Sequence, residues 1–245
     1  MSRALTMVTG ASRGIGRAIA LECARAGHDL FLVAQERKSE LEEAERLAKA
    51  AGAQLVLSSL CDISDETAVA AIFRRLPHPL TGLVNGAAFP GARARLVEQD
   101  MDDIDRILSV NLRGTLLMCR FALTSMSRRT GGGGGAIVNL SSQSARFGGD
   151  RLVAYSATKA GIEGLTVSLA REVAGEGVRV NAVSPGPVLT EPVRTLPAEK
   201  LEAMQASLPM GRFCTPEEIA HTVLWLLSDA ASYVSGIVVP VHGAR

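Results

Sequence analysis

Short β-type segments alternate with longer helical segments along all 245 residues of the chain. Seven short runs rich in branched apolar residues have the composition of buried strands: Ala4–Thr9, Asp29–Ala34, Gln54–Ser58, Gly82–Asn85, Ala136–Ser141, Arg179–Val183 and Ile237–Val241. Between them, six segments carry apolar residues at helical spacing: Arg17–Ala26, Leu41–Ala51, Glu66–Leu76, Met101–Met126, Ala154–Val173 and Pro216–Ser228. This alternation predicts one α/β domain over residues 1–245, a Rossmann-type doubly wound fold whose seven-stranded parallel sheet has helices on both faces.

Two helix starts and one turn are also marked in the sequence. Asp65 and Thr215 precede predicted helices and have side chains that cap helix N-termini, and Pro216 follows Thr215 in the first turn. The five glycines at 131–135 join a helix to a strand and lack the Lys-Ser/Thr pair of a phosphate-binding loop. We therefore interpret them as a flexible turn.

The composition excludes several classes of protein. With 26 basic and 25 acidic residues the formal net charge is +1, so no overall field attracts nucleic acid or an anionic membrane. The first ten residues do not have the pattern of a signal peptide, and no apolar run approaches the length that spans a bilayer. We expect a cytoplasmic protein that binds neither nucleic acid nor membrane.

Four scattered cysteines lack metal-ligand spacing, so buried free thiols and no metal site are expected: Cys23, Cys61, Cys119 and Cys214.

A glycine-rich segment joins the first predicted strand to the first predicted helix. It contains the candidate cofactor residues Thr9, Gly10, Ser12, Arg13, Gly14, Ile15 and Gly16, with Ala11 between the first glycine and the serine. Glycines alone could form only a tight turn. In this position, however, the backbone N–H groups and the helix N-terminus face any bound pyrophosphate, which favours a dinucleotide site.

Further motifs follow in order along the chain. They are Asp62-Ile63, Asn85-Gly86-Ala87-Ala88, Val110-Asn111-Leu112, Asn139-Leu140-Ser141-Ser142, Tyr155-Ser156-Ala157-Thr158-Lys159 and Pro185-Gly186-Pro187-Val188-Leu189-Thr190. With the glycine-rich segment, they make the chain resemble the short-chain dehydrogenase/reductase family from Thr6 to about Gly243. The sequence departs from the family where Asn-Asn-Ala-Gly reads Asn-Gly-Ala-Ala at 85–88, and where Asp-Gly-Gly reads His-Gly-Ala at 242–244.

The resemblance implies a role for most of these motifs in holding a nicotinamide cofactor. Asp62 and Ile63 would flank the adenine, and Asn85, Gly86 and Ala87 would line the cofactor cleft. Pro185 and Gly186 begin the segment at the nicotinamide, where Val188 and Thr190 would hold the carboxamide. Tyr155 and Lys159 would contact the cofactor as well as the substrate, since the resemblance assigns Lys159 to the ribose hydroxyls.

Ser142, Tyr155, Lys159 and Asn111 are the candidate catalytic residues. Hydride transfer to a carbonyl leaves negative charge on oxygen, which requires a proton donor and a second hydrogen bond; Tyr155 and Ser142 can supply them. Lys159 lies four residues after Tyr155, on the same helix face, so its ammonium is expected to lower the pKa of the tyrosine. Both side chains could instead lie on an exposed helix face without a function. The chain has only 2 tyrosines, however, so a tyrosine and a lysine at this spacing are improbable by chance. The resemblance assigns Asn111 to a proton relay through water, although an asparagine in a helical segment can also simply kink it.

The end of the second predicted strand favours NADP over NAD. Selection of NAD normally uses an acidic residue there, and this chain has Ala34-Gln35. Gln35 is placed at the ribose, and Arg13 or Arg37 could pair with a 2'-phosphate. Glu36 is the competing signal, since turned inward it could take the acidic role.

Within the family, the closest general likeness is to bacterial 3-oxoacyl carrier-protein reductases, which predicts reduction of a 3-oxoacyl thioester. Such enzymes dock an acyl carrier protein on basic residues near the cleft; Arg128 and Arg129 lie close to one such place, but Glu176 stands at the other. The alternatives are a reductase of small ketones, sugars or polyketide-like intermediates, or a non-catalytic dinucleotide-binding regulatory protein. Residues 189–210 are interpreted as a substrate lid, and the resemblance implies a homotetramer.

Overall fold

The computed structural model describes residues 3–244, and at its centre lies one parallel sheet in the order β3-β2-β1-β4-β5-β6-β7. The strands are β1 (Leu5–Thr9), β2 (Asp29–Ala34), β3 (Val56–Leu60), β4 (Gly82–Asn85), β5 (Gly135–Leu140), β6 (Val178–Pro185) and β7 (Val238–Val241). The order reverses between β1 and β4, the point at which open α/β sheets bind their ligands. The fold class predicted from the sequence is confirmed.

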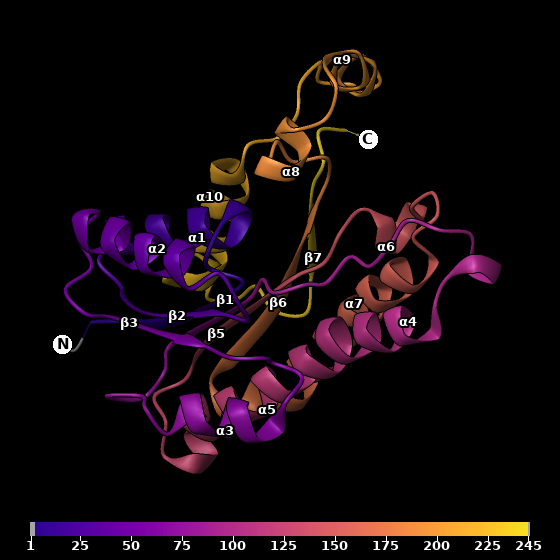
Figure 1. Ribbon diagram of the computed structural model, residues 1–245. Helices are drawn as coiled ribbons and strands as arrows, with labels where there is room; N and C mark the ends of the chain where they lie inside the picture. Colours follow the sequence, from indigo (N-terminus) through magenta and orange to yellow (C-terminus); the bar gives the residue numbers. More distant parts are fainter. Residues whose placement is uncertain (1–2, 245) are drawn as a thin grey trace.

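Helices cover both faces of the sheet (Figure 1). One face carries α1 (Gly14–Arg25), α2 (Lys38–Ala50) and α10 (Pro216–Leu227), and the other carries α3 (Glu66–Phe73), α5 (Thr115–Met126) and α7 (Val153–Val173). Because successive residues of a strand point to opposite faces, Met7 and Val8 of β1 lie in separate apolar clusters, one on each side of the sheet. Both residues are fully buried, so the sheet is the middle layer of three.

The predicted helix over residues 101–126 is divided in the structure. It consists of α4 (Met101–Leu108), a π-helical turn (Ser109–Gly114) and α5. A Cβ at Gly114 would lie 2.8 Å from side-chain atoms of Ile63, so the helix passes close to the loop after β3. Of the described residues, only this stretch is long and apolar enough to cross a membrane, and 50% of its most apolar window is buried within the protein. Its apolar character is therefore explained in part by packing on the sheet.

Most other boundaries agree with the sequence within a few residues. Helix α1 begins at Gly14, inside the glycine-rich segment, and β6 continues to Pro185. Asp65 caps α3 by accepting hydrogen bonds from the N–H groups of Thr67 and Ala68. Thr215 and Glu218 form a reciprocal capping box at the start of α10. Both predicted caps are therefore confirmed.

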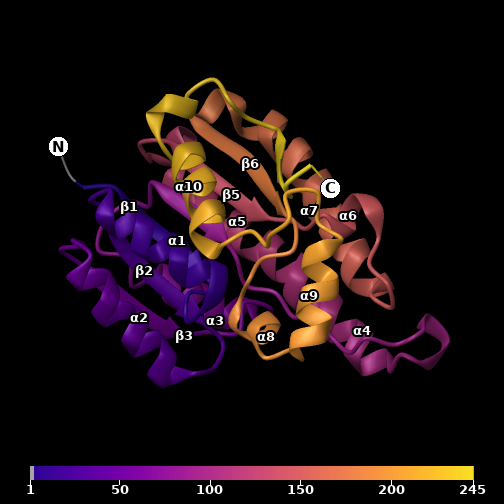
Figure 2. The ribbon, with the colours of Figure 1, turned by 90° about the horizontal axis from the view of Figure 1, so that it is seen from above.

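Several short elements connect these helices and strands. The remaining helices are α6 (Ser144–Phe147), α8 (Glu191–Arg194) and α9 (Ala198–Ala206), and 3-10 turns occur at Leu96–Glu98, Arg128–Thr130, Ala174–Glu176 and Asp229–Ala231. Helices α8 and α9 lie in the predicted lid and project beyond the sheet (Figure 1), and from above they lie beside one another (Figure 2). The glycines at 131–134 form the turn before β5, and Gly135 begins that strand. The four cysteines are free thiols, and all except the half-buried Cys214 are buried.

Candidate active site

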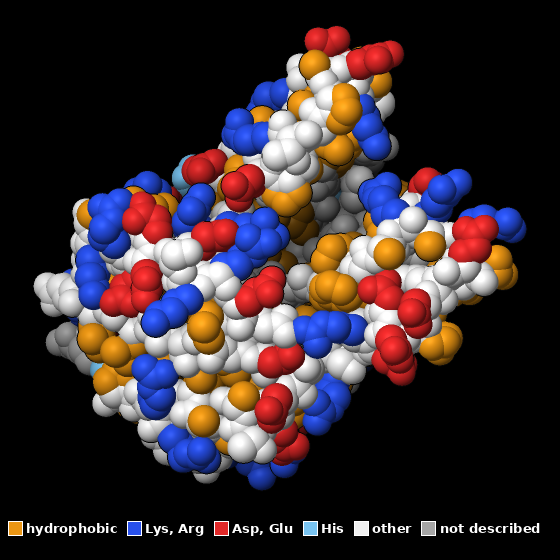
Figure 3. Space-filling model, in the orientation of Figure 1, with side chains coloured by type: hydrophobic (Ala, Val, Ile, Leu, Met, Phe, Trp, Pro, Cys, Tyr) orange, Lys and Arg blue, Asp and Glu red, His pale blue; other side chains and the backbone are white. Residues whose placement is uncertain are grey.

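A cleft of about 580 Å³ lies at the carboxyl ends of the strands, beside the β1/β4 switch point. The space-filling view is hollowed between the projection formed by α8 and α9 and the arm that carries α4 and α6 (Figure 3). Most of the residues proposed from the sequence line this cleft: Gly10, Ser12, Arg13, Gly14, Ile15, Gly16, Gln35, Arg37, Asp62, Ile63, Gly86, Ala87, Tyr155, Lys159, Pro185 and Thr190. Six proposed residues do not line it: Thr9, Asn85, Asn111, Ser142, Gly186 and Val188.

The glycine-rich segment packs so tightly that it has no room for side chains at two positions. A Cβ at Gly10 would lie 2.9 Å from the backbone of Gly86 and Ala87, and Gly10 has a φ of +71°. A Cβ at Gly16 would collide with the carbonyl of Gly10. At the start of α1, the N-cap residue is Arg13, whose side chain has no acceptor, so no side chain caps the helix N-terminus. These features leave backbone N–H groups facing the cleft and fit the pyrophosphate of a dinucleotide.

Thr9 and Asn85 support the cleft from beneath. The Thr9 hydroxyl accepts hydrogen bonds from the N–H groups of Gly86 (3.0 Å) and Ala87 (3.1 Å), which fixes the turn after β4. The amide of Asn85 donates to Asn139 Oδ1 at 2.8 Å. Both side chains are buried, so they shape the floor on which a cofactor would lie.

Gln35 and Asp62 meet at the end of the cleft where the resemblance places the adenosine. Gln35 Nε2 donates to Asp62 Oδ2 at 2.8 Å, and Arg106 lies 3.6 Å from the same oxygen. Partial burial tends to raise the pKa of Asp62, but hydrogen bonds from Ser64 and the nearby Arg106 lower it overall. Asp62 is thus a carboxylate acceptor in the wall, next to the apolar Ile63.

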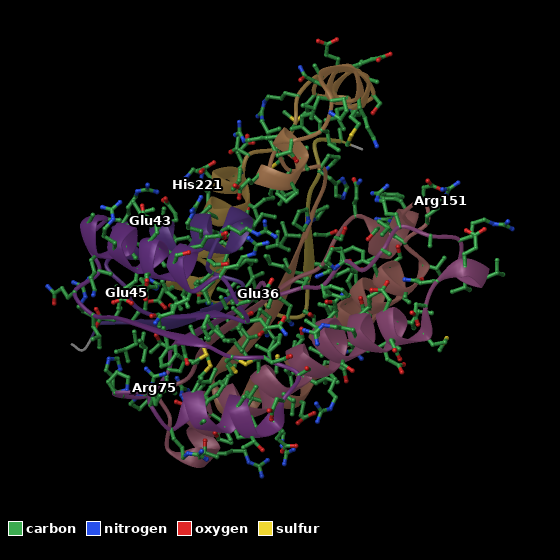
Figure 4. The ribbon with its side chains drawn as sticks, in the orientation of Figure 1. Glu36, Glu43, Glu45, Arg75, Arg151 and His221 are labelled. Carbon is green, nitrogen blue, oxygen red and sulfur yellow. The ribbon has the colours of Figure 1, made fainter. Side chains whose placement is uncertain are left out.

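Arg13 and Arg37 both line this end of the cleft, but they differ in their partners. Arg37 Nη1 donates to Glu40 at 2.8 Å, and its Nε lies 3.9 Å from Glu36. Arg13 forms no ion pair within residues 3–244. Glu36, which follows β2 (Figure 4), has a side chain that is 77% exposed. Arg13 is therefore the cation here that remains available to an anionic ligand.

Ser142, Tyr155 and Lys159 come together at the ends of β5 and α7. Ser142 follows β5, and its hydroxyl lies near that of Tyr155 on α7, where it acts to lower the pKa of the tyrosine. The Ser142 Oγ also accepts a hydrogen bond from Ser144 N at 3.2 Å. Lys159 Nζ lies 5.5 Å from the centre of the Tyr155 ring and donates to the Leu140 carbonyl at 2.7 Å. The three candidate residues thus share one corner of the site.

The pKa of Tyr155 differs from the sequence-based expectation. Burial raises the pKa of the Tyr155 hydroxyl, and the hydrogen bond from Ser142 opposes only part of that rise. Lys159 is itself buried, which lowers the pKa of its ammonium to about 8. The lowering expected from Lys159 therefore does not appear, and burial holds Tyr155 in its protonated form at neutral pH.

Asn111 is fully buried in the π-helical turn, and its side chain faces the protein. Its Oδ1 accepts from the Phe89 N–H at 2.7 Å, while its Nδ2 donates to the Phe89 carbonyl (2.9 Å) and to Thr158 Oγ1 (3.2 Å). Thr158 lies between Tyr155 and Lys159 on α7. Because both amide protons are used, this side chain is a brace between the cleft wall and α7. The relay through water that the resemblance implies stays a prediction.

At the end of the cleft where the resemblance places the nicotinamide, the segment after β6 is fixed by backbone contacts. Val188 forms a parallel bridge with Cys214, and Leu189 N donates to the Cys214 carbonyl at 2.8 Å. Gly186 N donates to the Val241 carbonyl at 3.0 Å. Val188 and Gly186 therefore position the backbone, while Pro185 and Thr190 reach the cleft surface.

Some lining residues were missed by the sequence reasoning, notably Phe89, Pro90 and Glu191. Phe89 and Pro90 follow the proposed Asn85-Gly86-Ala87-Ala88 motif directly, and their position just beyond a strand end was an available signal. Glu191 begins α8, and no local pattern distinguishes it from an ordinary first-turn glutamate. Glu191 lies in the wall of the cleft because the segment 189–210 folds back toward it.

Arg128 and Arg129 lie away from the cleft. Arg128 lines a separate surface hollow with Gly82 and Val178, which begin β4 and β6 at the amino ends of the strands. Arg129 Nη1 lies 3.5 Å from Glu176. The expectation that these arginines lie near the cleft is therefore wrong, because the turn that carries them leads into β5 and not out of it.

Comparisons with known proteins agree with this geometry. A family model described as enoyl-(acyl carrier protein) reductase, of the short-chain dehydrogenase type, matches residues 10–243. The uncharacterized oxidoreductase YgfF of Escherichia coli is 39% identical to the chain, covering 99% of the chain and 100% of that protein. The 3-oxoacyl-(acyl-carrier-protein) reductase FabG of Pseudomonas aeruginosa is 38% identical, covering 98% of the chain and 96% of that protein.

A solved structure of a variant of the actinorhodin polyketide ketoreductase with NADPH has a TM-score of 0.89 at 30% identity, covering 99% of this chain and 97% of that one. The fold and these matches define the chain as an NAD(P)-dependent oxidoreductase. It belongs to the short-chain dehydrogenase/reductase family.

Proposed function

We propose that this enzyme uses NADPH to reduce a ketone to a secondary alcohol, with Tyr155 as the proton donor. The observation that carries the proposal is the meeting of Ser142, Tyr155 and Lys159 beside the cleft formed by the glycine-rich segment. A non-catalytic dinucleotide-binding regulator would need none of these three groups, so their meeting speaks against that alternative.

Each residue has a distinct part in the reaction. The nicotinamide cofactor, when bound, supplies the hydride. Tyr155, kept protonated by burial, donates its proton to the carbonyl oxygen as negative charge develops there. Ser142 donates a second hydrogen bond that orients the same oxygen. The Lys159 ammonium stabilises the phenolate left behind, and Asn111 positions α7 through Thr158.

The preference for NADPH is supported by the charges at the adenosine end. Gln35 occupies the position of the acidic residue that selects NAD, and it is bound to Asp62. Arg13 is a guanidinium that lines the cleft and can pair with a 2'-phosphate. A charge-assisted hydrogen bond contributes about 1.5–3 kcal/mol, so Arg13→Ala should reduce kcat/KM for NADPH about 10- to 100-fold and leave that for NADH nearly unchanged.

Two substrate classes fit this reaction. A 3-oxoacyl thioester is favoured by the likeness to FabG. A small ketone, sugar or polyketide-like ketone is favoured by Glu176, which pairs with Arg129 where a carrier-protein reductase would have a basic residue. Residues 189–210, containing α8 and α9, act as a lid over either substrate. Docking of an acyl carrier protein belongs to the first class alone.

The same proposal includes a cytoplasmic homotetramer. Its contact surfaces would be α4, α5 and α7, where apolar side chains remain exposed: Met101 is 63% exposed, Leu116 is 50% exposed and Val153 is 50% exposed. A small monomeric mass in solution would contradict this assembly.

The test is an activity panel of acetoacetyl thioesters, diketones and sugars, with NADPH and NADH in parallel. Tyr155→Phe should lower kcat by about 10²- to 10⁴-fold, the usual contribution of a general acid, while NADPH still binds. If that variant turns over as fast as the wild type, the assignment of Tyr155 is wrong. If no ketone is reduced with either cofactor, the proposed reaction is wrong.

A further inference from the structure

Gln143 follows Ser142 directly, and its carboxamide oxygen is shielded from solvent without a hydrogen-bond partner among the described residues. A buried acceptor that is left unpaired costs about 1–3 kcal/mol, so native proteins nearly always satisfy such groups. The backbone here is well fixed, since Gln143 N donates to the Pro185 carbonyl at 2.9 Å. The unpaired oxygen is thus held in place next to the residue proposed to orient the substrate.

His242 lies at the same edge of the sheet. Strands β5, β6 and β7 are parallel neighbours, so Ser142, Gly186 and His242, which follow their carboxyl ends, lie side by side. The His242 ring packs edge-on against Phe147 of α6, with centroids 5.9 Å apart and planes at 88°. Helix α6 begins just after Gln143, which brings the imidazole toward the same corner.

Gly186 lies between the two side chains. A Cβ at Gly186 would lie 2.5 Å from His242 Cβ and 3.5 Å from Gln143 Oε1. The carboxamide oxygen and the histidine therefore lie on either side of Gly186, where no larger residue would fit. Within residues 3–244, His242 has no ion-pair partner, so both side chains present polar groups that the protein does not use.

We propose that Gln143 and His242 form a polar subsite for a substrate hydroxyl on a carbon next to the reacting carbonyl, which makes hydroxyketones the substrate class. The hydroxyl donates to Gln143 Oε1, an acceptor, and the imidazole provides the second polar contact. Because Gln143 follows Ser142 directly in the chain, the substrate group expected nearest to it is one on the carbon next to a carbonyl held by Ser142. This inference rests on the proposed ketone reduction and favours the second substrate class, because a 3-oxoacyl thioester has no such hydroxyl.

The experiment compares 1-hydroxybutan-2-one with butan-2-one under saturating NADPH, and again under saturating NADH. A single hydrogen bond changes kcat/KM by about tenfold. If both contacts form, kcat/KM of the wild type should be about 100-fold higher for the hydroxyketone than for butan-2-one. Gln143→Leu should lose about tenfold on the hydroxyketone alone. Gln143→Glu keeps an acceptor and should retain the preference, and the exposed Gln54→Leu is the matched control, which should change neither rate.

Equal rates on the two ketones in the wild type, or equal losses on both in Gln143→Leu, would overturn the subsite while leaving ketone reduction intact. Binding of butane-1,2-diol and butan-2-ol to the protein with NADP⁺, measured by calorimetry, gives a readout independent of turnover. Tighter binding of the diol that disappears in Gln143→Leu supports the subsite even if neither ketone is reduced. Equal binding of the two alcohols overturns it.

Discussion

Replacing Lys159 with methionine should stabilise the protein at neutral pH while abolishing its activity. The Lys159 side chain is only 3% exposed, and burial lowers the pKa of its ammonium from 10.5 to about 8. Between these two values the unfolded chain holds a proton that the folded chain has lost, so the wild type gains stability as pH rises. At pH 6.5 the charged lysine costs the folded state about 3 kcal/mol, a penalty that a methionine of similar length removes.

The hydrogen bond to the Leu140 carbonyl is lost in Lys159→Met, which offsets about 1–2 kcal/mol of this gain. The loss of this hydrogen bond depends little on pH, so any change with pH in the stability difference between the two proteins comes from the charge of Lys159. Urea unfolding of both proteins at pH 6.5 and 9.5 should show the advantage of the variant shrinking by about 2 kcal/mol as the pH rises. The exposed Lys38→Met serves as the control and should show no such trend. A difference that is constant or grows with pH would refute the buried-charge reasoning.

Further outcomes are expected at other positions. The pH profile of kcat/KM for ketone reduction should fall above about pH 8 as Lys159 loses its proton, and a flat profile to pH 10 would contradict this. Asn111→Ala should lower the free energy of unfolding by about 2–4 kcal/mol and also reduce kcat, because it leaves the Phe89 N–H and carbonyl unpaired; unchanged urea unfolding would exclude the brace. Thr215→Ala should lower the free energy of unfolding by about 1 kcal/mol and leave kcat unchanged. A fall in kcat would mean that the α10 cap also acts on the active site.

The layers and the order of the motifs could be predicted from the sequence because they depend on local patterns. Buried parallel strands have sequences that are short apolar runs. A glycine-rich turn between the first strand and the first helix indicates a phosphate site wherever that pair of elements occurs. The caps at Asp65 and Thr215 are equally local, since the capping bonds reach only two or three residues along the chain.

What the sequence did not reveal depends on contacts between distant segments. The division of the 101–126 helix accompanies contacts that Asn111 makes with Phe89, 22 residues away, and with Thr158, 47 residues away. The pKa of Tyr155 depends on how deeply the fold buries its hydroxyl, which its spacing to Lys159 in the sequence does not indicate. The unpaired oxygen of Gln143 likewise becomes evident only when β7 brings His242 beside Gly186.

The bridge between Val188 and Cys214 has a practical consequence for altering this enzyme. It ties the two ends of the lid excursion together, with Leu189 N and Cys214 N each bonded across the junction. The lid segment therefore begins and ends at one pair of backbone segments that are hydrogen-bonded to each other. This pair is separate from the glycine-rich turn and from α7. Residues 193–210 can accordingly be exchanged as a cassette with those of relatives, so that a set of chimaeras would redirect substrate choice while sharing one cofactor site and one proton donor.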